Sequence, residues 1–319
     1  MNIGNININI NGKAALAPMA GLTDKAFREI CAEHGASYFT SEMISTKGLI
    51  YKSEKTFELT ARSEKETTFA IQLFGNDPKD FEKAALLLLP LSPDIIDVNM
   101  GCPAPKIVKE GSGSALMQNP QLCADIVKAI KSVTAIPVTV KIRSGWNASS
   151  LNAVEVAHAC EKAEANAITV HGRTRDQMYS GTVNLDVIKN VKESTDVPII
   201  GNGDVTSVSS AEHIINYTGC DMIAIGRGAI GNPWIFNEIN SWFRSKKSPA
   251  PPEIKEKIKV MEAHIEKICK YKGETRGIKE IKNHIAGYIK GIPGAAECRK
   301  QAYLAESKQD LTNLFQRIM

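Results

Sequence analysis

The sequence predicts an α/β fold, a (β/α)₈ TIM barrel, followed by a small C-terminal helical domain. Eight short apolar or β-branched segments recur at intervals of roughly thirty residues, the length of a βαβ unit, and helical patterns lie between them. Strands that alternate with helices indicate a parallel sheet, and eight such units over about 250 residues match the usual size of a TIM barrel. An open, doubly wound sheet would show the same alternation, so periodicity alone leaves both folds open.

The N-terminal segment Met1–Asn11 alternates Asn and Ile, which predicts a short strand of a hairpin that closes one end of the fold. Helical spacing of apolar residues is clear in Pro120–Val133 and Leu151–Ala165. The eight expected barrel strands are, in order, Ala14–Ala17, Ser37–Ser41, Thr68–Phe74, Ile95–Asn99, Pro137–Ile142, Ala167–Val170, Pro198–Gly201 and Met222–Ile225.

The C-terminal part of the chain begins with a proline-rich segment. Residues 245–252 read Ser-Lys-Lys-Ser-Pro-Ala-Pro-Pro, a composition that predicts a linker. After it, Ile254–Cys269, Ile278–Ile289 and Gln301–Ile318 each predict a helix, and Gly291–Gly294 predicts a turn. We therefore expect a barrel domain over residues 1–244, a linker over 245–252 and a helical domain over 253–319.

Charge is distributed unevenly between these parts. Residues 246–319 contain 16 Lys and Arg against 9 Asp and Glu, a net charge of +7, whereas the other 245 residues carry a net charge of −3. A basic appendage on a near-neutral body is expected of a module that binds a polyanion. A solvated helical face has a similar composition, so charge alone leaves both interpretations open.

Composition excludes several classes of protein. The longest apolar run, Ala84–Leu91, contains Pro90 and is too short to span a membrane. The N-terminus has neither the basic region nor the small-residue cleavage site of a signal peptide. The seven cysteines are odd in number and form no C-x-x-C pair, which argues against a disulfide framework and a zinc site. We therefore expect a cytoplasmic protein without a metal. The sequence shows no sign of an obligate protein partner, and a monomer is expected.

Two glycine-rich turns predict a phosphate site. In a barrel, functional groups lie at the C-terminal ends of the strands, and the loops after strands seven and eight often bind phosphate. Here those loops contain Gly201–Asp204 and Gly226–Gly228. Glycine lets backbone N–H groups approach a phosphate closely, and Arg227 would add a bidentate, charge-assisted contact. A phosphate-bearing ligand is therefore expected.

Three further side chains follow strand ends. Lys141 and Arg143 are two residues apart on the fifth strand and so point to the same side. A lysine inside a barrel mouth needs an anion, and beside a flavin it would stabilise the negative charge of the reduced ring. The alternative is a lysine that extends to solvent. His171 either contacts the flavin or its phosphate, or is an ordinary structural histidine.

Cys102 is the most distinctive cysteine. It lies in a Gly-Cys-Pro turn just past a strand end, where burial as core filler is difficult to arrange. A thiol in such a place is expected to serve as a nucleophile or a proton donor. The sequence shows no Cys–His pairing, which favours acid catalysis over covalent hydrolysis.

These motifs together resemble the tRNA-dihydrouridine synthase family, and within it the bacterial B-type enzymes. The resemblance covers nearly the whole barrel, and the combination of N-x-G-C-P with V-H-G-R-T is specific to this family. In the tail, Lys282-Asn283-His284 with Tyr288 stands where family members often carry Arg-Lys-His and Tyr. The matching segments are L-A-P-M-A-G-L-T-D at 16–24, I-Q-L-F-G at 71–75, D-V-N-M-G-C-P-A-P-K at 97–106, G-S-A-L-M at 113–117, V-K-I-R-S-G-W at 140–146, I-T-V-H-G-R-T-R at 168–175, I-G-N-G-D-V at 200–205 and I-G-R-G-A-I-G-N-P-W-I-F at 225–236.

The resemblance implies FMN as the cofactor, NADPH or NADH as the reductant, and specific uridines of tRNA as the substrate. Reduced flavin would give a hydride to C6 of the uracil ring, and Cys102 would donate the proton to C5. The uridine must leave its stack, as in base-flipping enzymes. The residues implied to hold FMN are Pro18, Met19, Ala20, Gln72, Lys141, His171, Asn202, Gly203, Asp204, Gly226 and Arg227. The residues expected to contact the tRNA are Asn99, Lys106, Arg143, Arg173 and Arg175.

Two other functions remain open on the sequence alone. An FMN barrel that acts on a small pyrimidine, such as a dihydroorotate-dehydrogenase-like enzyme, would carry the same flavin loops, but its basic tail would have no purpose. A non-catalytic RNA-binding protein would have no use for Cys102 and complete flavin loops.

Overall fold

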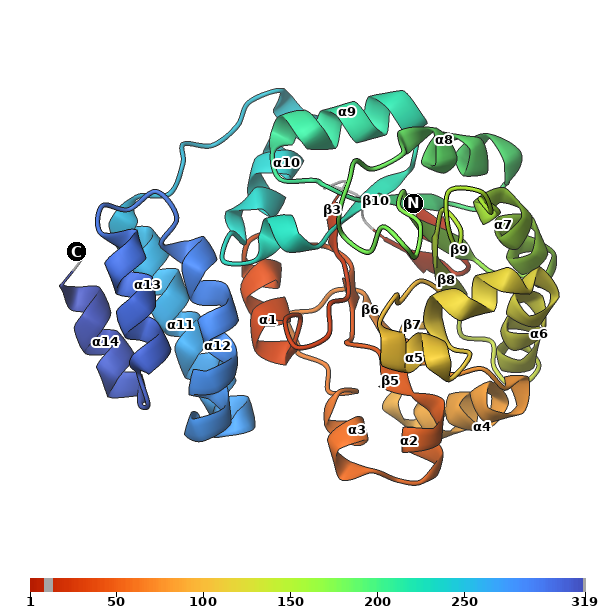
Figure 1. The fold of residues 1–319 in the computed structure, drawn as a ribbon, viewed down its shortest axis with the longest axis horizontal. Helices are drawn as coiled ribbons and strands as arrows, with labels where there is room; N and C mark the ends of the chain where they lie inside the picture. The colour runs from red at the N-terminus through yellow and green to blue at the C-terminus, as the bar shows by residue number, and fades with distance from the viewer. Residues whose placement is uncertain (9–13, 318–319) are drawn as a thin grey trace.

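Eight parallel strands form a closed barrel in the computed structural model, which describes residues 1–8 and 14–317 (Figure 1). β11 pairs with β3, and β4 pairs with β6, so the ring closes and the open-sheet alternative is excluded. All eight expected strands are confirmed, with ends that differ by at most two residues. In ring order the strands are β3 (Ala14–Leu16), β4 (Phe39–Thr40), β6 (Phe69–Phe74), β7 (Ile95–Asn99), β8 (Val138–Arg143), β9 (Ala167–His171), β10 (Ile199–Asn202) and β11 (Met222–Ile225). The short β5 (Ile44–Ser45) pairs with the end of β6.

The N-terminal hairpin is also confirmed for its described residues, whereas residues 9–11 lie outside the described part. β1 (Asn2–Ile3) and β2 (Ile6–Asn7) pair antiparallel, and Ile3 packs among apolar side chains of the barrel interior. Its turn residue Gly4 lies against Pro137 and Asn166, which precede β8 and β9. The hairpin therefore closes the amino-terminal end of the barrel.

Helices surround the barrel and bury their apolar faces against the strands. Local capping explains where they begin: α6 starts with Pro120, whose missing N–H costs nothing there, and the Asn119 side chain accepts from Leu122 N at 3.1 Å. The helices are α1 (Lys25–Glu33), α2 (Thr46–Ile50), α3 (Glu54–Glu58), α4 (Pro78–Leu88), α5 (Pro105–Lys109), α6 (Pro120–Lys131), α7 (Ala153–Lys162), α8 (Leu185–Ser194), α9 (Val208–Thr218) and α10 (Trp234–Ser245). Short 3₁₀ helices are η1 (Leu89–Leu91), η2 (Gly113–Gln118) and η3 (Arg227–Ala229).

The C-terminal tail contains four helices, α11 (Ile254–Lys272), α12 (Glu274–Tyr288), α13 (Ala295–Leu304) and α14 (Lys308–Gln316). The expectation of one helix over Gln301–Ile318 is wrong. Ser307 and Asp310 form a capping box, each side chain accepting from the other's backbone N–H, and this starts a new helix. The turn at Gly291–Gly294 is confirmed, and residues 247–253 carry no helix or strand. Within the described part of the chain, no helix is long and apolar enough to cross a bilayer.

The tail packs against the barrel through α1 and the start of α10 (Figure 1). Ala26 and Trp234 of the barrel belong to the apolar core of the tail. The ring of Phe27 stacks on that of His264 at 5.3 Å between centroids and lies 4.4 Å from that of His284. The tail is therefore a docked part of the same molecule.

Part of the positive charge of the tail is used in this contact. Lys267 pairs with Glu29 at 2.9 Å, and Lys272 pairs with Asp24 at 2.5 Å. Burial opposes ionisation of Glu29, but hydrogen bonds from Tyr271, Ser63 and Lys267 outweigh it and lower its pKa to about 2. The basic excess read from the sequence therefore serves partly to hold the tail in place.

Candidate active site

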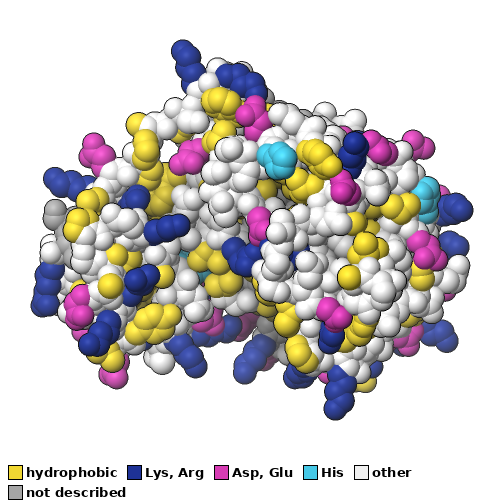
Figure 2. Space-filling view, turned by 45° about the horizontal axis from the view of Figure 1, so that its top comes forward, with side chains coloured by type: hydrophobic (Ala, Val, Ile, Leu, Met, Phe, Trp, Pro, Cys, Tyr) yellow, Lys and Arg dark blue, Asp and Glu magenta, His cyan; other side chains and the backbone are white. Residues whose placement is uncertain are grey.

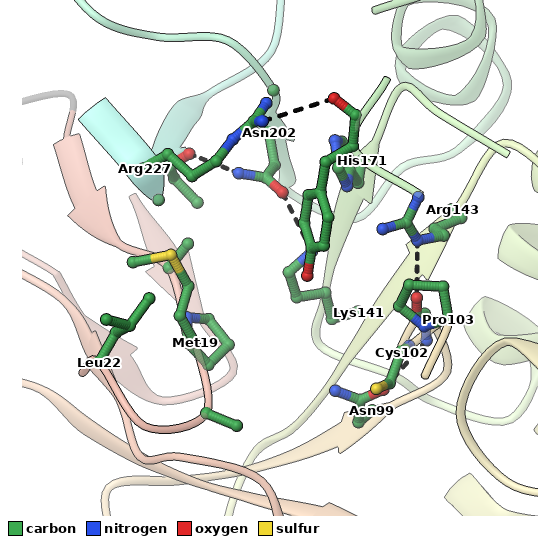
Figure 3. Close-up of a pocket in the computed structure, with 18 of the residues that line it drawn as sticks. Met19, Leu22, Asn99, Cys102, Pro103, Lys141, Arg143, His171, Asn202 and Arg227 are labelled. Atoms are coloured by element: carbon green, nitrogen blue, oxygen red, sulfur yellow. Dashed lines mark hydrogen bonds between the residues drawn. The ribbon is translucent and has the colours of Figure 1, made fainter. Parts of the chain in front are cut away.

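A cavity of about 740 Å³ opens at the carboxyl-terminal end of the barrel (Figure 3). This volume lies within the range of pockets that hold small molecules and cofactors. Every residue expected to hold FMN contributes to its lining, and so do Cys102, Asn99 and Arg143. Lys106, Arg173 and Arg175 do not belong to the lining. The structure thus brings the expected flavin contacts together but only some of the expected tRNA contacts.

The topology places the glycine turns and the cysteine on opposite sides of this cavity. Arg227 follows β11 and Cys102 follows β7, and these strands are four apart in either direction around the ring of eight. Lys141 on β8 lies between them (Figure 3). A ligand that reaches both sides must therefore cross the whole barrel mouth.

One side of the cavity carries two arginines around a single carboxylate. Asp204 follows Gly203 in a left-handed conformation with φ of 49°, and its carboxylate accepts from Arg173 and Arg227, the latter at 2.9 Å. The hydrogen bond from Arg173 is the main reason why the pKa of Asp204 is lowered. A Cβ on Gly226 would lie 3.3 Å from the sulfur of Met19, so a side chain there would narrow the space. Two arginines against one carboxylate leave a net positive charge at these turns.

His171 and Lys141 lie on the neighbouring strands β9 and β8, next to the side of the cavity that carries Arg227. Burial, followed by the nearby charges of Lys141 and Arg143, lowers the pKa of His171 to about 2, so its imidazole is neutral near pH 7. Burial and the charge of Arg143 lower the pKa of Lys141 to about 8, against the opposing influence of Asp97. Lys141 therefore remains mostly protonated near neutral pH, while His171 is limited to neutral hydrogen bonds.

The direction in which Lys141 points is determined by Asn202. The amide nitrogen of Asn202 donates to the carbonyl of Ala224 at 2.7 Å, which turns its oxygen toward the barrel interior. That oxygen accepts from Lys141 Nζ at 3.1 Å (Figure 3). An ammonium group has three N–H donors, so Lys141 keeps others for an anionic atom in the cavity.

Cys102 is held by its backbone on both sides. Its N–H donates to Asn99 Oδ1 at 2.9 Å, and its carbonyl accepts from Ser114 N and Ser114 Oγ at 3.0 Å each. Gly113 has a left-handed φ of 61°, and a Cβ there would lie 2.7 Å from the Cys102 carbonyl oxygen. The G-S-A-L-M motif thus packs on the turn of Cys102. Five other cysteines are buried and the sixth, Cys269, is half-buried on α11.

The loop between β9 and α8 supplies two lining residues that sequence reasoning missed, Met178 and Tyr179. The Tyr179 ring lies 5.3 Å from the Arg227 guanidinium and 5.7 Å from that of Arg143. Arg143 donates to the carbonyl of Met178 at 2.8 Å, so these arginines also hold the loop. The only available signal was position, since the loop follows a strand end.

The expected tRNA contacts have different environments. Arg143 is buried and lines the cavity beside Asn99, whereas Lys106 is exposed on α5. Arg175 lies 4.6 Å from the Trp146 ring and pairs with Asp176 at 2.8 Å.

All five N–H groups of Arg173 are used within the protein, and its side chain is 2% exposed. The acceptors of Arg173 are Asp204, His171 and the carbonyls of Ser180 and Gly181. Arg173 therefore organises the site and leaves no donor for a nucleotide.

The tail residues that match the family pattern are also used internally. Lys282 donates to the carbonyls of Tyr303 and Ala305, at 2.8 Å each, at the end of α13. His284 and Tyr288 are buried against the barrel. This stretch stabilises the tail and its contact with the barrel.

A closed parallel barrel with a cavity at its carboxyl-terminal end, where glycine turns and arginines lie opposite a fixed thiol, has the architecture of a TIM-barrel enzyme. A family model described as dihydrouridine synthase matches residues 15–319. The chain therefore belongs to the dihydrouridine synthase family.

Known relatives agree over most of the chain. The tRNA-dihydrouridine synthase B of Pasteurella multocida is 41% identical over 293 residues, which are 92% of this chain and 87% of the relative. That of Shewanella oneidensis is 40% identical over 88% of this chain and 87% of its own. The barrel is also similar to solved structures, including morphinone reductase in complex with tetrahydroNAD, with a TM-score of 0.53 and 12% identity over 79% of this chain and 91% of that one. A histamine dehydrogenase from Rhizobium sp. 4-9 has a TM-score of 0.57 and 13% identity over 84% of this chain and 50% of its own. These two likenesses show the fold alone.

Proposed function

We propose that this protein reduces the C5–C6 double bond of specific uridines in tRNA, with FMN as cofactor, NADPH or NADH as reductant and Cys102 as proton donor. The observation that carries the proposal is the thiol fixed on a rigid turn opposite the anion-binding glycine turns. The names of the relatives, tRNA-dihydrouridine synthases, support the substrate. The small-pyrimidine alternative predicts turnover without tRNA.

The residues present fit FMN. Gly203, Gly226 and Arg227 offer the phosphate a cationic, side-chain-free surface, and Lys141 offers a positive charge where the ring would lie. The remaining expected contacts, Pro18, Met19, Ala20, Gln72, His171, Asn202 and Asp204, line the same cavity. When bound and reduced, FMN supplies the hydride that C6 of the uracil ring receives.

The chain's own groups complete the reaction. The Cys102 thiol gives its proton to C5 on the face of the ring opposite the hydride, and solvent then reprotonates the sulfur. Asn99 and Arg143, which line the cavity next to Cys102, bind the uracil and its phosphate. Lys106 and Arg175 lie outside the lining and would contact the surrounding tRNA.

The tail is proposed to hold the body of the tRNA, with residues 1–244 as the FMN domain and 253–319 as the RNA domain. On the face shown in Figure 2, Lys and Arg side chains spread over the tail, at the left, with fewer acidic ones between them. Such a surface favours a polyanion through counterion release. We further propose that the protein acts in the cytoplasm and as a monomer, since one chain builds the whole cavity.

The test is Cys102→Ala in the flavin-loaded protein. Flavin reduction by NADPH does not need the thiol and is expected to proceed at a near-normal rate. Dihydrouridine formation, measured in single turnovers on unmodified tRNA with pre-reduced flavin, is expected to fall by about 10²–10⁴-fold. Cys269→Ala, at the other half-buried cysteine, serves as the control. Undiminished uridine reduction by Cys102→Ala would assign the proton to another group, and a protein that takes up no FMN would refute the cofactor.

A further inference from the structure

Asp97 is a buried carboxylate that the proposed reaction does not use. It lies on β7 two residues before Asn99, on the same face of the strand, and is 3% exposed beneath the cavity. Burial raises the pKa of Asp97 to about 6, although hydrogen bonds from Thr139 and Gln72 oppose the rise. In the structure both oxygens of Asp97 accept hydrogen bonds, as those of an ionised carboxylate do.

The two oxygens of Asp97 have different partners. Oδ1 accepts from the Thr139 hydroxyl at 2.5 Å, and Oδ2 accepts from Gln72 Nε2 at 2.6 Å. Among the described residues, no ion pair involves Asp97. The charge of Lys141 favours the ionised form of Asp97 without forming a direct ion pair with it. A carboxylate without a direct ion pair is costly to bury, so a carboxylate used only for packing would be a poor choice at this position.

The contact with Asp97 determines the direction of a chain of amides. Because the carboxylate carries no hydrogen, Gln72 must turn its NH₂ group toward it, and its oxygen then faces Asn99. Asn99 Nδ2 donates to that oxygen at 2.8 Å. The oxygen of Asn99 is thereby left to accept the N–H groups of Gly101 at 3.2 Å and Cys102 at 2.9 Å.

We propose that Asp97 is a positioning residue that sets the direction of this amide chain and, through Gln72 and Asn99, holds the turn that carries Cys102. The inference rests on the proposed function, in which the thiol must be held at C5 of the uracil ring. Reversal of the Asn99 amide would place its NH₂ group against the N–H groups of the turn, which would lose their acceptor. Reversal of the Gln72 amide would place its NH₂ group against the NH₂ group of Asn99 and so favour that same reversal of Asn99.

Asp97→Asn tests the direction of the chain while preserving its shape. The new amide at position 97 can present either its oxygen or its NH₂ group to Gln72, so the direction is no longer specified. In the FMN-loaded protein, we expect iodoacetamide to alkylate Cys102 about five- to tenfold faster, the effect of losing one buried hydrogen bond. The kcat for dihydrouridine formation is expected to fall by a similar factor, with the KM for tRNA and the FMN content unchanged.

Two further variants separate direction from packing. In the double variant Asp97→Asn with Gln72→Glu, the new amide donates to the new carboxylate, whose other oxygen accepts from Asn99. This restores the original direction, so Cys102 alkylation is expected to return to within about twofold of the wild-type rate. Thr139→Val removes the other hydrogen bond of Asp97 but leaves the amide chain intact, and is expected to alkylate as the wild type does.

The proposal is overturned if Asp97→Asn alkylates Cys102 at the wild-type rate, if Thr139→Val accelerates alkylation as much, or if the double variant does not restore it. Should Asp97→Asn fail to fold, Gln72→Met breaks the chain one bond nearer the turn and must accelerate alkylation in the same way. Alkylation requires no turnover, so a wild-type protein that forms no dihydrouridine would refute the proposed function and leave this test intact.

Discussion

Arg227 reaches the cavity from η3 with half of its side chain exposed, and the protein nonetheless holds it in one orientation. Asp204 accepts one of its N–H groups at 2.9 Å, and the carbonyl of Tyr179 accepts another at 3.4 Å. A guanidinium oriented in advance loses less entropy when it binds an anion. Arg227 is therefore the residue through which phosphate binding is best tested.

Arg227→Ala is expected to weaken FMN binding by about 1.5–3 kcal/mol, since hydrogen bonds to charged groups contribute that much. The measurement is a fluorescence titration of the flavin-free protein with FMN. Arg175→Ala is the matched control, because that guanidinium lies on Trp146 outside the cavity lining. Equal affinities for wild type and Arg227→Ala would place the phosphate elsewhere.

Helix α12 links the tail to two loops of the cavity. His284 hydrogen-bonds the backbone of Leu22, which lies in the β3–α1 loop and lines the cavity. One turn further along α12, Gly287 packs directly on the η3–α10 loop. A Cβ on Gly287 would lie 2.1 Å from the carbonyl oxygen of Ile230, another lining residue, and 2.9 Å from Gly231 Cα. The close approach requires glycine on both sides.

Gly287→Ala is expected to destabilise the protein and to weaken FMN binding. In an isolated helix, replacing Gly by Ala would stabilise the helix by about 1 kcal/mol. A loss of protein stability would therefore show that the close backbone contact at position 287 outweighs this gain in helix propensity. Thermal unfolding and FMN titration measure the two effects.

Gly277→Ala is the matched control, because a Cβ there would meet Cys269 of α11, within the tail, at 2.9 Å. It is expected to lower stability but to leave FMN affinity unchanged. If both variants bind FMN as the wild type does, α12 does not support the cavity loops.

At the scale of the whole molecule, the barrel–tail contact combines buried histidines with buried ion pairs. Burial lowers the pKa of His284 to about 4, and burial also lowers the pKa of His264 well below its ordinary value. Glu29 keeps its charge until far lower pH, because its pKa is about 2. The stabilisation from Glu29 is thus complete above about pH 4.5 and is lost only as the pH falls toward 2.

Acid is therefore expected to weaken the contact first through the histidines. Between pH 6.5 and pH 4 His284 is protonated in the unfolded chain but stays neutral in the folded protein, whose His284 pKa is about 4. The free energy of unfolding therefore falls as the pH drops through this range. Relative to His284→Asn, the wild type is expected to lose a few kcal/mol of unfolding free energy between pH 7 and pH 4.

Denaturant titrations at several pH values measure this difference. His213→Asn on α9, outside the tail contact, is the control and should follow the wild type. A pH-independent difference between wild type and His284→Asn would show that the histidine is not buried as a neutral group.

The sequence by itself determined the strands, the glycine turns and the place of Cys102. These features depend on neighbours along the chain, such as the period of apolar residues or a glycine after a strand end. The extra helix start at Ser307 was equally local, but its Ser-x-x-Asp pattern lies inside a stretch with continuous helical periodicity. Patterns of neighbouring residues therefore predicted the structure correctly where they agreed, and failed at Ser307, where a helix-start signal lies inside a longer helical periodicity.

Tertiary structure alone decided which polar groups remain available. Arg143, Arg173 and Arg227 are the same residue type at similar strand ends, yet only Arg227 is half exposed. The donors of Arg173 are taken up by Asp204, His171 and two loop carbonyls. Likewise, Lys267 of the tail forms an ion pair with Glu29 of the barrel, more than two hundred residues away, so its charge holds the tail against the barrel. The physical reason is that a hydrogen bond or ion pair depends on distance in space, which the chain determines only when the barrel closes and the tail packs against it.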